Sequence, residues 1–497
     1  MLATNLNFYS MPVQLLRAAV LLAAGSQQAA ASAQRQQPTG APTQPHDGPA
    51  AAAKVVYVAP NASEASGDGS LANPFTLAAA ARSLRGKAAG ATVLLRGGDY
   101  HISSPWVLTA ADGGAAGAPV TYASHPGERA RLLGGIGVPA GAFHPAASHP
   151  QAPGLLVADL RALGIQNRST LGAGGGMGDL KAELFASGSD GLFEPLQMAQ
   201  DPNPFPNGSW VYAGFSEILA ANASWFVLDA AAPHVRLDLW RSATNLSLYG
   251  HWDSDYGDMK SYRVLSMAPI KEGPRHLPEA FNITLDGGVV VTPGRRFVAT
   301  DALALLDSPG EYWIDRQSLK LFLVPPRGGI GSRSYFLSVG PSLADPSASK
   351  RSLAGLLEIH SVPHLRLENL TVAASTQSLL IANGSTGLEI EGCDFLGAGL
   401  DCVSVTNAAH TRIRGSTIAH CGGTGLTLTG GTWAADSDEL SLFDTPELPA
   451  DLWVPANVSL IDSHLHHWAR LQRVSSRPGI SWTGVGHTIR GCTIVSL

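Results

Sequence analysis

Charged side chains are scarce in this chain, and those of positive sign form no basic run. Asp, Glu, Lys and Arg make up 14% of the 497 residues, against the roughly 25% that is usual in soluble proteins. The formal net charge is -6. Because binding to nucleic acid depends on a concentration of Lys and Arg, this composition excludes nucleic acid as the expected partner.

Long apolar runs are also missing. Beyond the N-terminal region no segment approaches the roughly 20 apolar residues that a membrane-spanning helix needs, so we expect no membrane span in the mature protein. What the chain has in quantity is 55 glycines and 33 prolines. Both residues favour turns, and they predict many short strands and bends rather than amphipathic helices.

Cysteine is rare, and all four cysteines fall in the last quarter of the chain: Cys393, Cys402, Cys421 and Cys492. An even number permits disulfides in an exported protein. Buried free thiols are equally consistent with the sequence.

The first 53 residues have the composition of a leader and a linker. A short apolar run follows Arg17, and a pattern of small residues ends at Ala33, which predicts a signal peptide at 1–33. The alternative is an Ala-rich tail. Residues 34–53 are rich in Gln, Pro, Ala and Gly without an apolar period, which predicts a disordered linker.

Sequons for N-glycosylation support export as a secreted glycoprotein to the extracellular space or cell wall. The glycosylation candidates are Asn61, Asn167, Asn207, Asn222, Asn245, Asn282, Asn369, Asn383 and Asn457.

Folding is expected to begin near Lys54. Residues 54–135 open with the strand sequence VVYV, and LAAAARSLRG predicts one short helix there. Residues 136–350 hold short aromatic-rich segments, such as HVRLDLW, EYWID and LKLFLVP, between Pro and Gly turns. We interpret these segments as strands of an antiparallel β region.

Residues 351–497 contain a repeat. HLRLENLTV, GLEIEGCDF and HTRIRGSTI begin at His364, Gly387 and His410, and NVSLIDSHL and GHTIRGCTI follow at longer steps. A period of about 23 residues, with apolar residues at every second position, predicts stacked turns of a parallel β-helix. A third strand per turn is expected in SLLIAN, CVSVTN, LTLTGG and GISWTG. The predicted fold class is all-β: a right-handed parallel β-helix (solenoid) with an intervening antiparallel β region.

The stacking limits the possible disulfides. Cys393 and Cys492 share one column but lie three turns apart, which at about 4.8 Å per turn is roughly 14 Å and too far for a bridge. Cys402 and Cys421 lie on adjacent turns near the same corner. They are the only candidate pair for a disulfide.

Several stretches resemble a known family. VYVAPNASEASGDGSLANPFTLAAAARSL and TVLLRGGDYHISSPWVLTAADGGAAGAPVTYASHPGERARLLGG are similar to the N-terminal signature of secreted right-handed β-helix (pectin-lyase-like) proteins. These are related to the β-helix glycoside hydrolases, a group that includes α-L-fucosidases. LLDSPGEYWIDRQSLKLFLVPP and SRPGISWTGVGHTIRGCTI resemble later segments of that family, so the resemblance covers roughly residues 55–497.

The resemblance implies hydrolysis of a glycosidic bond, but it assigns no catalytic residue in this chain. In the family, further turns that carry the catalytic acidic residues follow the GVGHTIRGCTI type of segment. No residue here matches those positions. The turns are therefore expected to be incomplete, with the catalytic residues beyond Leu497.

Outward-facing side chains are the candidates for binding substrate. Asp394 and His464 are expected on one face, two turns apart, with Asp401 near the next corner. The segment HLHHWARLQRVSSRPGISW adds the further candidates His466, Trp468, Arg470, Arg477 and Trp482. Histidines transfer protons, arginines bind carboxylates and tryptophans stack on sugar rings. The alternative is a long loop that covers the side of the β-helix, with Trp468 as its anchor.

In this segment no separate third ligand follows the adjacent histidines at the spacing of a known zinc motif, so neither a metal nor another cofactor is expected. The leading hypothesis is a secreted, monomeric, glycoside hydrolase-like protein acting on cell-wall or matrix polysaccharide. One alternative is a non-catalytic carbohydrate-binding or wall-associated β-helix protein. Another is a polysaccharide lyase of the same fold, which would need an outward Asp and Glu cluster for calcium and a nearby Lys or Arg base.

Overall fold

The computed structural model describes residues 54–495 apart from internal gaps, and every structural statement below concerns the described residues only. The gaps are residues 65, 88, 148–151, 173–181, 189–190, 204–215, 222–225, 229–235, 244, 253–258, 270–280, 287–290, 340–354, 434–452, 455 and 474–475. The predicted signal peptide, the predicted linker and the sequons at Asn207 and Asn222 lie outside the described residues.

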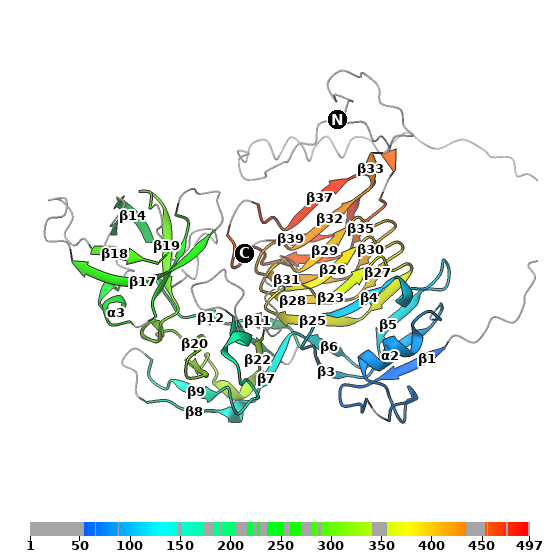
Figure 1. Cartoon of the computed structure of the whole chain (residues 1–497), viewed down its shortest axis with the longest axis horizontal. Helices are drawn as coiled ribbons and strands as arrows, with labels where there is room; N and C mark the ends of the chain where they lie inside the picture. The colour runs from blue at the N-terminus through cyan, green and yellow to red at the C-terminus, as the bar shows by residue number, and fades with distance from the viewer. Residues whose placement is uncertain are drawn as a thin grey trace, which may run out of the picture. The chain divides into compact units, whose positions relative to one another are not determined.

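Three parallel sheets form the sides of a β-helix (Figure 1). Sheet 1 consists of β1 (Val55–Val58), β2 (Thr92–Leu95), β5 (Val120–Ser124), β24 (Leu365–Glu368), β27 (Glu389–Glu391), β30 (Arg412–Arg414), β35 (Ser459–Ile461) and β38 (Thr488–Arg490). Sheet 2 consists of β3 (Gly98–His101), β6 (Ala130–Leu133), β25 (Leu370–Ser375), β28 (Asp394–Ala398), β31 (Thr417–Cys421), β36 (His464–His466) and β39 (Thr493–Val495). Sheet 3 consists of β4 (Trp106–Thr109), β23 (Gly355–His360), β26 (Ser378–Asn383), β29 (Val403–Thr406), β32 (Leu426–Gly430) and β37 (Ile480–Gly484).

Like residues stack on like inside the β-helix. On sheet 1, Leu367, Ile390, Ile413 and Leu460 pair in register and are almost fully buried. On sheet 2, Val372, Phe395, Ile418 and Leu465 do the same. The alternation that the sequence shows is therefore the alternation between core and outer face, and the prediction of a parallel β-helix is confirmed.

The corners of the β-helix are made by residues in the left-handed region of the backbone map. Between sheets 1 and 2 the column of such residues is Asn369, Gly392, Gly415, Asp462 and Gly491, with φ between 49° and 68°. Only Gly, Asn and Asp adopt this conformation with little strain. Their backbone amides continue the hydrogen-bond ladder through the corner, since the Asn369 N–H donates to the Glu391 carbonyl and the Gly392 N–H to the Arg414 carbonyl.

The antiparallel region is an insertion between two neighbouring turns. The chain leaves the β-helix after β6 and returns at β23, yet Leu357 pairs with Trp106, Leu365 with Val120 and Leu370 with Ala130. The turns before and after the insertion therefore form one continuous solenoid. All pairings inside the insertion are antiparallel except that of β12 with β20.

The strands of the insertion form three sheets. They are β7 (Gly135–Val138), β8 (Phe143–Pro145), β9 (Leu156–Asp159), β10 (Leu184–Ser187), β11 (Phe193–Pro195), β12 (Gln197–Met198), β13 (Gln200–Asp201), β14 (Ser216–Ala221), β15 (Phe226–Leu228), β16 (Ser247–Gly250), β17 (Lys260–Pro269), β18 (Phe281–Leu285), β19 (Arg296–Thr300), β20 (Glu311–Asp315), β21 (Lys320–Leu323) and β22 (Ser334–Ser338). A separate hairpin joins β33 (Thr432–Trp433) and β34 (Trp453–Val454).

Helices are few and short. Helix α2 (Leu77–Leu84) lies where LAAAARSLRG predicts one, and it begins at Thr76, whose hydroxyl accepts a hydrogen bond from the Ala79 amide at 3.2 Å. Short 3-10 helices occupy Ala110–Asp112, Ala140–Ala142, Arg168–Leu171, Leu303–Leu305 and Ile330–Ser332. No described helix has the length and apolar character that crossing a membrane requires.

The strand predicted for HVRLDLW is wrong, because its described part forms helix α3 (Leu237–Ser242). The cause is a contact that sequence periodicity does not contain. The buried Asp201 carboxylate accepts hydrogen bonds from the Arg236 amide at 3.0 Å and from the Trp240 indole at 2.6 Å. The first bond satisfies the backbone amide at the start of the helix, and the second holds the Trp240 side chain against the same carboxylate.

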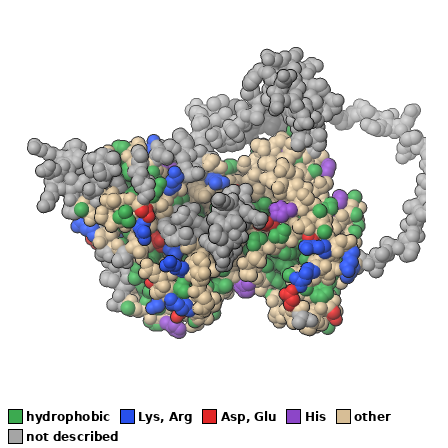
Figure 2. All heavy atoms as spheres, viewed as in Figure 1, with side chains coloured by type: hydrophobic (Ala, Val, Ile, Leu, Met, Phe, Trp, Pro, Cys, Tyr) green, Lys and Arg blue, Asp and Glu red, His purple; other side chains and the backbone are tan. Residues whose placement is uncertain are grey.

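Cys402 and Cys421 form a disulfide between adjacent turns, with their Cα atoms 5.3 Å apart. Cys393 and Cys492 are free. The sequons at Asn61, Asn167, Asn245, Asn369, Asn383 and Asn457 are exposed, as an attached glycan requires. Figure 2 shows Lys and Arg side chains interspersed with Asp and Glu on the face in view.

The stacked core predicts a clear difference between neighbouring positions of β30. Ile413 is fully buried, so Ile413→Ala should lower the free energy of unfolding by about 2–5 kcal/mol in urea titrations. Arg412→Ala is the matched control, because Arg412 is half exposed and its ion pair with Glu389 spans 3.5 Å; we expect a loss of at most about 1 kcal/mol. Equal losses for the two variants would contradict the assignment of inward and outward positions.

The two free thiols should differ in reactivity. Burial raises the pKa of the Cys393 thiol to about 12, whereas Cys492 is partly exposed. Because the thiolate is the reactive form, the native chain should take up one equivalent of maleimide at Cys492, and Cys393 should react only after unfolding. Peptide mass spectrometry without reductant measures both thiols and the Cys402–Cys421 bridge. Fast native labelling of Cys393 would show that this part of the core is open.

Candidate functional site

The outward face of sheet 2 carries a polar column that becomes more exposed toward the later turns. Thr371, Asp394, Thr417 and His464 pair in register on β25, β28, β31 and β36. Thr371 is buried, Asp394 and Thr417 are partly exposed, and His464 is exposed. Asp394 and His464 therefore lie on one face, two strands apart, as the sequence repeat predicts.

Asp394 is a partly desolvated carboxyl group. Its carboxylate lies 3.4 Å from the Arg129 guanidinium, and only 17% of the side chain is exposed. Burial raises the pKa of this carboxyl, while Arg129 and a hydrogen bond with Thr417 oppose the shift. A carboxyl group that holds its proton more readily is suited to act as a general acid.

No second carboxylate lies at hydrolytic distance within the described part of this column. Asp99 is the other acid there, and it lies three strands away from Asp394 through Arg131 and Thr371. At about 4.8 Å per strand the separation is roughly 14 Å. Hydrolysis by paired carboxylates needs about 5 to 9.5 Å. Asp99 moreover forms an ion pair with Arg131 at 2.6 Å.

The insertion covers the neighbouring outward column of sheet 2. Phe185, Phe193 and Phe336 from β10, β11 and β22 form a buried cluster with the outward residues Leu133, Ala373, Leu396 and Ala419. In the next strand the residue that pairs with Ala419 is His466. The apolar cover therefore ends at β31; the column then carries His466 on β36 and the exposed Val495 on β39.

The segment after β36 joins the β-helix to the insertion. The Arg470 guanidinium forms two hydrogen bonds with the buried Glu183 carboxylate, at 2.5 and 3.1 Å. Leu471 packs against the apolar core of the insertion, and its carbonyl accepts a hydrogen bond from the Tyr249 hydroxyl. Arg470 is thus held by a protein carboxylate, and its guanidinium serves the docking of this loop.

Three other candidates also have structural partners. Trp468 packs against the core of the β-helix, beneath Gly479, which agrees with its predicted role as a loop anchor. The Arg477 guanidinium lies 3.7 Å from the Asp401 carboxylate. The same carboxylate accepts a hydrogen bond from the Thr424 amide at 2.7 Å.

Trp482 is not on the outward face where a sugar platform would lie. It pairs with Leu428, and it continues the inward column that also contains Val405. Its side chain is 56% exposed, because it belongs to the last described turn of sheet 3 and no described strand covers it. Its exposure therefore reflects its position in the stack.

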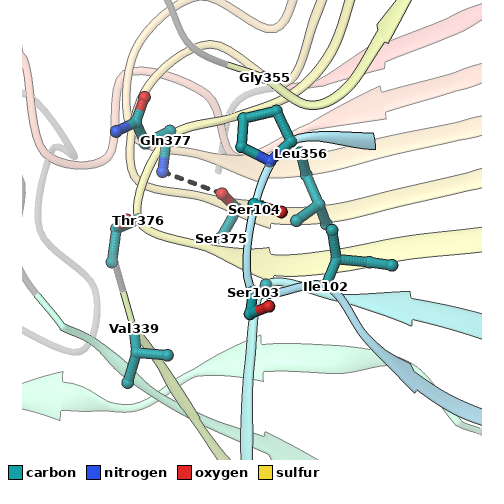
Figure 3. A pocket seen from close by; sticks show the side chains of 11 residues that line it. Ile102, Ser103, Ser104, Val339, Gly355, Leu356, Ser375, Thr376 and Gln377 are labelled. Carbon is teal, nitrogen blue, oxygen red and sulfur yellow. Dashed lines mark hydrogen bonds between the residues drawn. The ribbon is translucent and has the colours of Figure 1, made fainter. Parts of the chain in front are cut away.

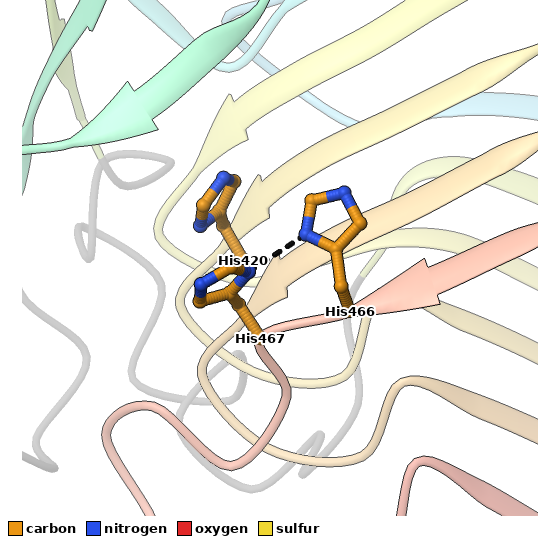
Figure 4. Close-up of side chains that lie close together, drawn as sticks. All are labelled: His420, His466 and His467. Carbon is orange, nitrogen blue, oxygen red and sulfur yellow. Dashed lines mark hydrogen bonds between the residues drawn. The ribbon is translucent and has the colours of Figure 1, made fainter. Parts of the chain in front are cut away.

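Two histidines that are not among the sequence-based candidates, His420 and His467, form a cluster with His466. His420, His466 and His467 offer ring nitrogens that all lie within 4.8 Å of one another (Figure 4). Desolvation lowers the pKa of each imidazole, that of His420 to about 3. The repeat could have identified His420. It follows Gly397 by 23 residues, which is one period, and therefore occupies the equivalent position of the next turn.

Two small pockets adjoin the β-helix. One, at the point where the insertion leaves and rejoins, is lined by residues such as Ser103, Thr376 and Gln377 (Figure 3) and has a volume of about 20 Å³. The backbone amide of Gln377 donates a hydrogen bond to the Ser375 hydroxyl there, at 3.0 Å. The other, of about 70 Å³, is lined by Glu183, Arg470 and their neighbours. Both volumes are far below the roughly 300 Å³ of a small-ligand pocket, so an open face is the better candidate for a polymer.

The fold defines the chain as a parallel β-helix protein. No protein-family model and no curated protein matches its sequence. Among solved structures it is similar to a glycoside hydrolase, with a TM-score of 0.58 and 16% identity, over 84% of this chain and 74% of that chain. At this identity the likeness shows the fold alone.

Two further likenesses are weaker. XylC, solved in complex with xylose, gives a TM-score of 0.43 with 10% identity, over 88% of this chain and 58% of that chain. The pectate lyase Pel9A gives a TM-score of 0.28 with 11% identity, over 87% of this chain and 57% of that chain.

The Arg470–Glu183 pair can be tested by removing one partner. Arg470→Met leaves a buried carboxylate without its counter-ion, so the free energy of unfolding should fall by about 3–5 kcal/mol. Adding Glu183→Gln removes the buried charge and should restore much of this loss in a double-mutant cycle measured in urea. Arg333→Met is the control, because its ion pair with Glu194 is exposed and contributes about 1 kcal/mol or less. If the losses caused by Arg470→Met and Glu183→Gln simply add in the double variant, the two side chains are not coupled.

Proposed function

We propose that this chain is a secreted, carbohydrate-active β-helix protein of the glycoside hydrolase type, and that it binds polysaccharide along the open part of sheet 2. The observation that carries the proposal is the outward column in which Asp394, Thr417 and His464 lie on successive turns of one face. Such a column repeats polar groups at the spacing of the strands, which suits a long polymer better than a small molecule.

The column contains groups that recognise sugar hydroxyls. His464 is exposed, and Thr417 and Asp394 offer a hydroxyl and a carboxyl on the same line. Polar groups of this kind donate and accept hydrogen bonds in the directions that neighbouring hydroxyls of a sugar require. The solved glycoside hydrolase with the same fold supports carbohydrate as the ligand class.

A role in binding has more support than a complete hydrolytic site within the described residues. The other carboxylate in the Asp394 column lies roughly 14 Å away, beyond the spacing of either hydrolytic mechanism. Asp394, with its raised pKa, would supply the acid, and the partner carboxylate would have to come from elsewhere. If no such partner carboxylate exists, the chain would bind carbohydrate without cleaving it, and this is the second candidate function.

The test is binding of the purified full chain to a panel of plant, fungal and algal wall polysaccharides, measured by affinity electrophoresis and by release of reducing ends. At least one polysaccharide should retard the chain. Because a typical hydrogen bond contributes about 0.5–1.5 kcal/mol, His464→Ala should weaken that binding by roughly 2- to 10-fold. Asp394→Asn should abolish any release of reducing ends while the chain still binds.

Thr488→Ala is the matched control, since Thr488 is exposed on sheet 1, on another side of the β-helix. Binding without release in the wild-type chain would support the non-catalytic candidate. Absence of binding to every polysaccharide, or an equal loss for Thr488→Ala, would refute the proposed site.

A further inference from the structure

Three imidazoles from two successive turns lie close together at the C-terminal ends of strands β31 and β36 of sheet 2. His420 follows Ala419 in β31, and His467 directly follows β36; both have left-handed backbones, with φ of 58° and 53°. Their rings stack, with centroids 4.9 Å apart and an interplanar angle of 27°. His466 stands nearly perpendicular to both rings, at 5.4 and 5.0 Å (Figure 4).

The repeat explains why the rings coincide. On β25, β28 and β31 the residues Ala374, Gly397 and His420 occupy the same unpaired bulge position, each with a positive φ. In the earlier turns this column lies under the insertion, and a Cβ atom on Gly397 would lie 2.4 Å from the Phe185 ring. Beyond the apolar cover the same column carries imidazoles, in His420 and then His467.

We propose that His420, His466 and His467 form a binding site for one divalent transition-metal ion of the class that imidazole prefers, represented by Zn²⁺. Three ring nitrogens supply three ligands, and the fourth position is left for water or a ligand oxygen, which is the arrangement of open zinc sites. The site is separate from the proposed sugar column, and it does not depend on that proposal.

The distances fit with small movements. Zinc bonds imidazole nitrogen at about 2.0–2.1 Å, so nitrogens in a tetrahedral site lie roughly 3.4 Å apart. The three ligand atoms here lie within 4.8 Å of one another. The Nδ1 atoms of His466 and His467 are already 2.7 Å apart and share a hydrogen bond. To bind one ion, the most distant pair of nitrogens would have to approach by at most about 1.4 Å, and the close pair would have to separate by about 0.7 Å.

Burial and the neighbouring charged side chains leave the three imidazoles able to bind a cation. Burial lowers the pKa of all three imidazoles and so favours the neutral form, which is the form that coordinates a metal. The positive charge of Arg470, which acts on His420, is compensated by the buried Glu183 carboxylate. On the other side the carboxylate of Glu194 acts on His467 and favours positive charge there. An ion bound at this place would link the turn of β31 to the loop that begins at His467.

The experiment uses the purified full chain after treatment with a chelator, titrated with ZnCl₂ alone in a calorimeter. We expect one zinc per chain, a rise in melting temperature on adding zinc, and visible absorption bands when Co²⁺ replaces it. His420→Asn and His467→Asn are the test variants, because Asn tolerates the left-handed backbone that both positions require. Each should weaken zinc binding by more than the roughly 10- to 100-fold caused by losing a residue that only supports a ligand.

His144→Ala is the matched control, since it removes one exposed histidine from β8 in the insertion. The melting temperature of each zinc-free variant shows whether it has folded. Three results would overturn the site: no stoichiometric binding by the folded wild-type chain, unchanged affinity in folded His420→Asn and His467→Asn, or an equal loss in His144→Ala. Because zinc is added without polysaccharide, failure here leaves the proposed sugar-binding function unaffected.

Discussion

The register between successive turns is the constraint on which the rest of the structure depends. Each strand of the β-helix hydrogen-bonds to its neighbours in the turns before and after it, and the left-handed residues at the corners carry the ladder from one sheet to the next. A slip of one residue would move every apolar side chain from the core to the surface. Because the register holds, a residue type repeated at one position becomes a line of side chains on one face. The core columns and the outward polar column both arise in this way.

The insertion shows how firmly this register is fixed, and it determines which part of the outer face is open. About two hundred residues separate β6 from β23, yet the pairing on either side of them continues without a gap in the stack. The inserted sheet that contains β10, β11 and β22 then packs on sheet 2 through three phenylalanines. The buried pair of Arg470 and Glu183 fixes the loop after β36 to the same insertion. In the column that the insertion covers, the first polar side chain after the apolar residues is that of His466 on β36.

Sequence was sufficient for whatever depends on period, and insufficient for whatever depends on contacts across the insertion. The inward columns and the three strands per turn follow from alternation and a constant repeat, and so does the proximity of Cys402 and Cys421. Helix α3 depends on Asp201, which lies more than thirty residues earlier in the chain. Arg470 looked like a ligand for sugar because Glu183, almost three hundred residues away, is invisible to local patterns. Trp482 was expected to be a platform for sugar rings. Its inward direction is set by its pairing with Leu428, and local sequence does not show that pairing.

The same reasoning relates the two proposed sites to each other. His464 and His466 are two residues apart on β36, so their side chains project from the same face, about 7 Å apart along the strand. A polymer lying on the column of Asp394 and His464 would therefore pass close to His466, one of the three residues that would hold the ion. Asp394 lacks a carboxylate partner at hydrolytic distance in its own column. An ion at that site would add a Lewis acid to the face that carries Asp394. Binding of sugar and binding of metal are separable, and their coupling would be measured by titrating polysaccharide with and without zinc.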